Sequence, residues 1–213
     1  MLCNIIVKEG DMPPKIRYSR NEVIKAAMKV VDENGLGSLT ARKVAAKLGS
    51  STAPVYNHFT AMDELALDVM KETQKMLLEY TSRPYTDRVF LNMGTGVAMF
   101  ALEHGQLYRS LMLEGDSFSD VFSEFIEILE TQMTMDSRFT FLSESERHGL
   151  LKKMWTYTHG LAALICVGLI KDCNQDYIIN SLVDVGTDVI GATLEKHKTA
   201  AKNGAAGRIK NET

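Results

Sequence analysis

Residues 39–59, LTARKVAAKLGSSTAPVYNHF, carry the strongest structural signal in this chain. In the first half of this stretch Thr40 precedes a short run with apolar residues at helical spacing, and Gly49 follows where the chain must turn. The second half opens with small side chains and with Pro54, which a helix accepts in its first turn because no N–H is needed there. Two short helices joined by a glycine turn are typical of a helix-turn-helix unit.

A longer helix is expected immediately before this pair. Ser19 and Glu22 have the spacing of a capping box, and apolar residues then repeat on one helical face up to Val31. Asn34 and Gly35 supply a C-terminal stop. The sequence therefore predicts three helices within about 40 residues, the arrangement that places the third helix in a DNA groove.

The remainder of the chain also reads as helical, because no segment after residue 12 alternates apolar and polar residues in the manner of a strand. A capping box at Ser143 and Glu146 is the clearest of its boundaries. The fold class predicted is all-α. Further helices are expected at about 60–80, 86–103, 106–113, 118–134, 144–170 and 175–197.

The charge of the chain is unevenly distributed. Of its 213 residues, 13–61 hold eight basic and three acidic side chains, so this stretch carries +5, whereas the whole chain carries −3. A basic head on an acidic body is expected when one part meets phosphates and the other does not. There is no signal-peptide pattern at the start, and the longest apolar run, 160–170, is too short to span a bilayer. These features predict a soluble cytoplasmic protein that does not enter a membrane.

The first 45 residues of the helical part carry a more specific pattern. The residues that form it are Ile24, Ala26, Ala27, Val30, Glu33, Gly35, Leu39, Thr40, Arg42, Val44, Ala45, Leu48, Gly49, Ser51, Val55, Tyr56, His58, Phe59 and Leu65. This run resembles the N-terminal signature of the TetR family of bacterial repressors. Two positions depart from it: Ser50 replaces the usual Val or Ile, and Met62 stands where a basic or polar residue is common.

The resemblance implies a set of DNA contacts. Thr40 and Arg42 are expected at the DNA backbone, and hydroxyl groups and arginines suit that role. His58 has an alternative role in stabilising the hinge to the next helix, and Tyr56 has an alternative place in the core. Base contacts are implied for Thr52, Ala53, Pro54 and Asn57, with Ser51 small enough to enter the groove, and phosphate contacts for Tyr56, His58, Arg17 and Arg20.

Composition predicts a flexible arm (1–18) and a disordered tail (198–213). Between them, the resemblance implies a helix-turn-helix DNA-binding domain (19–62) and a helical effector-binding and dimerisation domain (63–197). The operator bound by a homodimer should be near-palindromic. The expected effector pocket, suited to a small and largely apolar ligand that releases the operator, comprises Met99, His104, Tyr108, Phe122, Phe125, Trp155 and His159. The expected dimer interface comprises Leu161, Leu164, Leu182, Val185 and Val189.

Two other functions have weaker support in the sequence. An enzyme is disfavoured, because no nucleophile–base pattern, phosphate-binding glycine loop or metal-ligand spacing is present, and neither a cofactor nor a metal is expected. A redox-responsive regulator would use Cys166 and Cys173, which lie seven residues apart, or about 10 Å on an unbroken helix. That separation is too long for a disulfide within one helix, so a bend near Lys171 or a link between subunits would be required.

Overall fold

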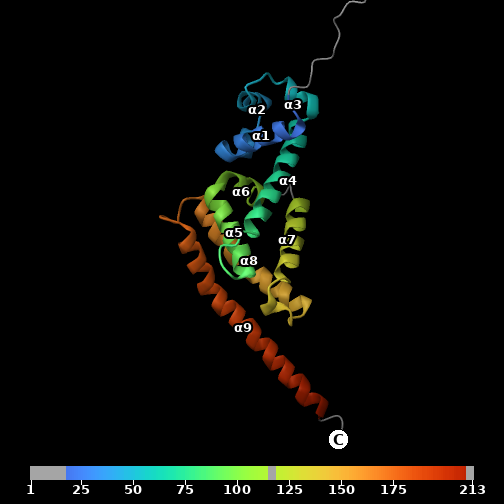
Figure 1. Ribbon diagram of the computed structural model, residues 1–213, viewed down its shortest axis with the longest axis vertical. Helices are drawn as coiled ribbons and strands as arrows, with labels where there is room; N and C mark the ends of the chain where they lie inside the picture. The colour runs from blue at the N-terminus through green and yellow to red at the C-terminus, as the bar shows by residue number, and fades with distance from the viewer. Residues whose placement is uncertain (1–17, 115–118, 210–213) are drawn as a thin grey trace, which may run out of the picture.

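A computed structural model describes residues 18–114 and 119–209, and all regular structure within them is helical (Figure 1). The all-helical fold with an N-terminal helix-turn-helix domain is therefore confirmed. The arm predicted for residues 1–18, including Arg17, lies outside the described residues except for Tyr18. The helices are α1 (Arg20–Asn34), η1 (Leu36–Ser38), α2 (Ala41–Leu48), α3 (Ala53–His58), α4 (Met62–Thr81), α5 (Val89–Glu103), α6 (Gly105–Met112), α7 (Ser119–Met133), η3 (Ser137–Phe139), α8 (Glu144–Cys166) and α9 (Gln175–Ile209).

The head of the molecule consists of α1, α2 and α3. The capping box predicted at Ser19 and Glu22 is present, with each residue bonded to the backbone of the other. Gly49 closes α2 in the left-handed conformation, at a φ of 61°, which explains the glycine at this turn. Val44 of α2 and Val55 of α3 are buried with the apolar face of α1, in a core that continues into the body.

Helix α4 joins the head to the body (Figure 1). Ala61 is the N-cap of α4, and Glu64 accepts a hydrogen bond from the Thr60 backbone N–H. Because Glu64 also pairs with Arg20 of α1, the residue that fixes the start of α4 also ties it to the head.

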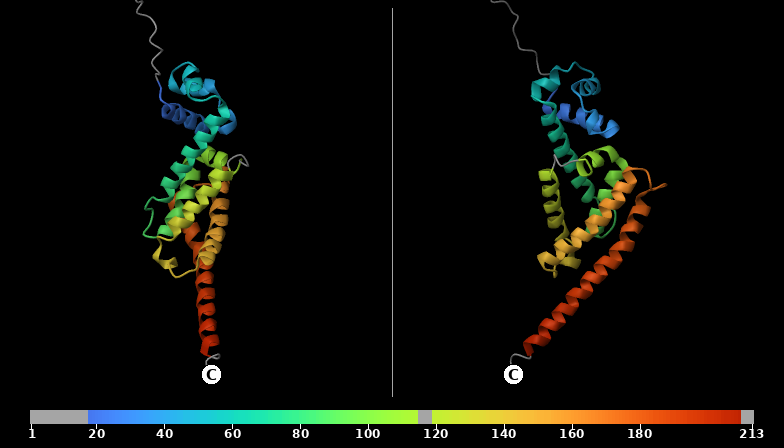
Figure 2. Two further views of the ribbon diagram at one scale, coloured as in Figure 1. Left: turned by 90° about the vertical axis from the view of Figure 1, so that its right-hand side faces the viewer. Right: turned by 180° about the vertical axis from the view of Figure 1, so that it is seen from behind.

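Helix α5 forms the centre of the body, where it contacts α4, α6, α7, α8 and α9 (Figure 2). Its close approach to α4 depends on Gly96, since a Cβ at this position would lie 2.2 Å from the carbonyl oxygen of Tyr80. Within the described residues, no helix is long and apolar enough to cross a membrane.

The last two helices differ from their expected lengths. The expectation that α8 continues to residue 170 is wrong, because the chain turns at Gly168 with a φ of 69° after the helix ends at Cys166. The disordered tail predicted from residue 198 is also wrong as far as Ile209, because α9 continues to that residue and runs past the body (Figures 1 and 2). Alanine, lysine and arginine favour helix, and extending an existing helix needs no new nucleation.

Candidate nucleic-acid interface and ligand pocket

The outer surface of α3 carries the polar side chains expected to face DNA. Tyr56 is 61% exposed, and Asn57 and Ala53 are exposed beside it. Val55 is fully buried beneath them, so the helix is anchored on its inner side. The exposure of Tyr56 excludes the alternative in which this ring belongs to the core. Ser51 is also exposed, at the turn before the helix.

Pro54 does not belong to this surface. It was expected to face bases, but it is buried with Val55 on the inner side of α3. In a helix of six residues, positions 54, 55, 58 and 59 fall on one side, and this is the side that packs on the head. Thr52, half-buried, precedes the helix as its N-cap.

The start of α2 adds a second polar surface. Thr40 and Arg42 are exposed, and the Thr40 Oγ1 caps the helix by accepting a hydrogen bond from the Lys43 N–H at 3.3 Å. Lys43 is exposed next to them and was not among the expected contact residues. The excess of positive charge in the head was the signal that could have identified it.

Arg20 and His58 have partners inside the head. The Arg20 guanidinium donates to Asp68, to Glu64 and to the His58 carbonyl, and it lies over the Phe59 ring at 4.1 Å. These bonds occupy four of its five N–H groups, so a phosphate would find only one. The His58 Nε2 lies 2.7 Å from the Tyr18 carbonyl oxygen. Both side chains therefore stabilise the hinge between α3 and α4, the alternative considered for His58.

Helix α6 contacts the head from the body side. The His104 Nδ1, at the start of α6, lies 2.8 Å from the Asp32 Oδ2 of α1. The Leu36 N–H donates to the Ser110 Oγ at 3.3 Å. Head and body are therefore joined at two places, through α4 and through α6.

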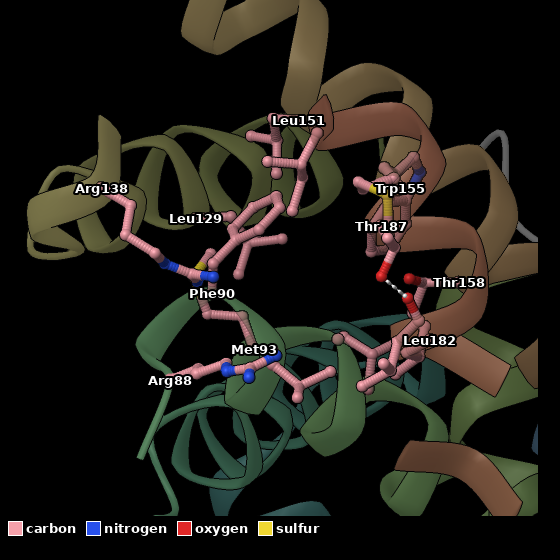
Figure 3. Close-up of a pocket in the computed structure, with 17 residues that line it drawn as sticks. Arg88, Phe90, Met93, Leu129, Arg138, Leu151, Trp155, Thr158, Leu182 and Thr187 are labelled. Atoms are coloured by element: carbon pink, nitrogen blue, oxygen red, sulfur yellow. Dashed lines mark hydrogen bonds between the residues drawn. The ribbon is translucent and has the colours of Figure 1, made fainter. Parts of the chain in front are cut away.

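The body contains a pocket of about 160 Å³ between α5, α7, α8 and α9 (Figure 3). Its walls are mainly apolar, and Trp155, Leu151 and Met154 of α8 face Phe90 and Met93 of α5. The residues that line it are Arg88, Phe90, Leu91, Met93, Gly94, Val97, Leu129, Arg138, Leu151, Met154, Trp155, Thr158, Leu182, Val183, Gly186, Thr187 and Ile190.

Of the expected pocket residues whose side chains the structure describes, only Trp155 lines the pocket. Phe125 packs edge-on against the Trp155 ring, and His159 stacks on it, with ring centroids 5.5 and 5.4 Å away. Tyr108 is buried with its hydroxyl 2.8 Å from the His159 Nδ1, and burial lowers the pKa of His159, which favours the neutral imidazole. These residues form an aromatic cluster behind the pocket wall.

The other expected pocket residues lie elsewhere. Met99 packs in the core, and His104 bonds to the head. Phe122 belongs to α7, but its side chain lies outside the described part. Arg88 and Met93 could not be predicted as pocket residues, because the residues that line a pocket between four helices share no local sequence spacing.

The five residues expected at a dimer interface divide into two groups. Leu161 and Leu182 are buried in the core of the protomer, so they cannot form its outer surface. Leu164 is 45% exposed on α8, whereas Val185 and Val189 are half-buried on α9.

The two cysteines of the described region are free. Burial raises the pKa of the Cys166 thiol to about 11, and it also raises the pKa of Cys173. The thiolate is the reactive form of cysteine, so both groups are poorly prepared for oxidation at neutral pH. The chain does bend between them, but the chemistry of the two thiols gives no support to a redox switch.

Comparisons with known proteins agree with this arrangement. Residues 23–69 match the family described as "Bacterial regulatory proteins, tetR family". An uncharacterized HTH-type transcriptional regulator of Bacillus subtilis, YobS, is 20% identical over 72% of this chain and 82% of its own. Another from Mycobacterium tuberculosis, Rv0681, is 23% identical over 83% of each chain. The fold is similar to that of a TetR-family structure from Streptomyces coelicolor, SCO1917, with a TM-score of 0.58 and 14% identity over 78% of this chain and 96% of that one.

An exposed recognition helix on a three-helix head, followed by a helical body, defines a helix-turn-helix DNA-binding protein. Its DNA-binding part, residues 23–69, is that of the TetR family of helix-turn-helix transcriptional regulators.

Proposed function

We propose that this regulator is a cytoplasmic repressor that binds a near-palindromic operator as a homodimer and is released by a small molecule bound in the body. The observation that carries the DNA contact is the surface of α3, where Ala53, Tyr56 and Asn57 are exposed above a buried anchor. Asn57 has the donor and acceptor pair that suits adenine, and Ala53 suits a thymine methyl. Thr40, Arg42 and Lys43 contact the flanking phosphates.

The homodimer is proposed to form through the outer faces of α8 and α9. Gly160, Leu164 and Val167 follow one another at helical spacing on the exposed side of α8, and a Cβ on Gly160 would meet nothing within 4 Å in this chain. An open glycine next to exposed apolar side chains lets a partner helix approach closely. Two-fold symmetry of such a dimer presents two α3 helices to two half-sites.

Release is proposed to run from the pocket along α5 to the head. The pocket is lined by the first half of α5, and the end of this helix leads directly into His104 and α6. A ligand that shifts α5 moves the bond between His104 and Asp32, and with it the orientation of the head. The two recognition helices then no longer fit the half-sites. A ligand acts in this way only if its affinity differs between the two arrangements.

The test is DNA binding by the full chain, measured at several salt concentrations on the DNA next to its gene and on unrelated DNA of equal length. We expect selective binding to a near-palindromic site, with an affinity that falls steeply as the salt concentration rises. Asn57→Ala should weaken binding to this site by roughly tenfold and leave binding to unrelated DNA unchanged. If both DNAs bind equally, a selection from random sequences follows, and failure to enrich any site there would refute the proposal.

A further inference from the structure

The two sides of the pocket differ in chemistry. Arg88 and Arg138 are the charged members of its lining, and no acidic side chain is among the lining residues. Figure 3 shows both arginines entering the pocket from the same side, while Trp155, Thr158 and Leu182 lie across it. One end therefore offers positive charge, and the other is mostly apolar.

The two arginines differ in how firmly a carboxylate of the protein holds them. Arg138 is held by Asp136, to which its Nε and Nη2 donate at 2.9 and 2.6 Å, and this buried carboxylate also accepts the Phe90 N–H. The nearest carboxylate to Arg88 is that of Asp87, 4.0 Å from its Nε, and Asp87 is almost fully exposed. Arg88 can therefore turn to an incoming carboxylate, for which the guanidinium offers two parallel N–H groups.

Thr158 supplies a polar group at the other end. It is only 3% exposed, and it lines the pocket. Its Oγ1 would lie 3.4 Å from a Cβ on Gly94, whereas Arg138 is bonded at the level of Phe90. Four residues of α5 separate these levels, about 6 Å along the helix. Because Thr158 lines the pocket, a polar group of a ligand at this end can form a hydrogen bond with its hydroxyl.

The space between the two ends limits the size of the ligand. Phe90, Met93, Leu151 and Trp155 enclose an apolar middle, and the pocket holds about 160 Å³. An apolar cavity of about 150 Å³ accommodates one benzene molecule. We propose that the pocket binds a small aromatic carboxylate whose acid group meets Arg88 and whose ring carries a hydroxyl that meets Thr158. This inference rests on the proposed function only in that the pocket is treated as the effector site.

Binding can be followed directly, because Trp155 is the one tryptophan of the sequence and it lines the pocket. The probes are 4-hydroxyphenylacetate, phenylacetate, which lacks the hydroxyl, and tyrosol, which lacks the carboxylate. We expect saturable quenching of Trp155 fluorescence by 4-hydroxyphenylacetate, with a Kd about tenfold below that of tyrosol and several-fold below that of phenylacetate. Equal binding of acid and alcohol, or no saturable binding of any probe, would overturn the proposal.

Three variants assign the contacts. Arg88→Ala should raise the Kd of both acids by roughly three- to tenfold, a range that allows for the half-exposed position of this side chain, and leave tyrosol unaffected. Thr158→Val, which keeps the shape of the side chain, should abolish the difference between the two acids. Lys152→Ala removes an exposed positive charge of α8 outside the pocket and should change none of the Kd values. An Arg88→Ala protein that binds acids as tightly as the Lys152→Ala protein contradicts the assignment.

The same proteins separate this inference from the function it extends. Operator binding without any probe tests the regulator, and Trp155 quenching without DNA tests the ligand class. A selected operator without probe binding refutes the ligand class alone. Probe binding that leaves operator affinity unchanged supports the ligand class and refutes release by that ligand.

Discussion

Gly96 shows how a single missing side chain fixes the crossing of α4 and α5. A Cβ there would lie 2.2 Å from the Tyr80 carbonyl oxygen, a backbone atom that cannot turn away. We predict that Gly96→Ala lowers the free energy of unfolding by about 3 kcal/mol, as expected for overpacking against backbone. Gly149→Ala is the matched control: it lies in α8 with open space at its Cβ, so it should raise stability by about 0.5–1 kcal/mol. Denaturant unfolding of both proteins measures the difference, and similar values would refute the packing argument.

The roles of single residues could be predicted where they depend on residues close to them in the sequence. Ser19 and Gly49 act where capping and turn rules place them. Arg20 was assigned to phosphate, but its partners Glu64 and Asp68 lie more than 40 residues away on α4. Pro54 was assigned to bases because its size suited the groove, whereas its direction depends on how α3 packs. Composition gives the type of a side chain, and only the fold gives its direction.

The start of α8 contains a carboxyl group whose pKa is strongly lowered, that of Glu146. Glu146 accepts hydrogen bonds from the Ser143 backbone N–H, then pairs with His197 and the Ser143 hydroxyl, and these bonds hold its pKa at about 2. A carboxyl whose pKa is lower in the folded state stabilises the fold above its unfolded pKa, near 4.5. That contribution is lost as the pH falls from there through about 2.

Glu146→Gln should therefore lower the Tm at pH 7 and make little difference at pH 2. Glu144→Gln is the control, since this residue is in the same first turn but makes no hydrogen bond or ion pair with the described residues. Thermal unfolding of the three proteins across this pH range measures the effect. A Tm difference for Glu146→Gln that stays constant down to pH 2 would instead indicate lost packing.

The helices of the body could be predicted from the sequence, but the pocket between them could not. Periodicity predicted that each helix from α4 to α9 exists, although not always where it ends, because each helix carries its own apolar face. It did not identify the pocket, whose walls come from α5, α7, α8 and α9 at once, with Arg88 more than 60 residues before Trp155. The aromatic residues that stood out in the sequence, Phe125 and Tyr108, are large and therefore fill the core behind the pocket.

At the level of the whole molecule, the proposed dimer would set the spacing of the two recognition helices. Leu164 is exposed on the same face of α8 as Gly160 and Val167, so Leu164→Glu places a charge at the centre of the proposed interface. We expect this change to shift the protein toward monomer in sedimentation velocity and to weaken operator binding, because each monomer holds one half-site. Met135→Glu, at a more exposed apolar residue away from α8, should remain dimeric. A dimeric Leu164→Glu protein would exclude this face as the interface.

The last prediction concerns the connection between the body and the head. The His104–Asp32 pair joins α6 to α1 across 72 residues of sequence, and the end of the pocket-lining helix α5 leads straight into it. His104→Gln should leave ligand binding to the body intact but reduce the ligand-induced change in operator affinity, a coupling of typically about 1–3 kcal/mol. Combining it with Asp32→Asn in a double-mutant cycle isolates the pair. His148→Gln removes a comparable histidine–carboxylate pair, with Glu130, that does not touch the head, and it should leave the coupling unchanged. If the ratio of operator affinities with and without ligand is the same in His104→Gln as in His148→Gln, the signal passes through α4 instead, where Arg20 holds Glu64 and Asp68.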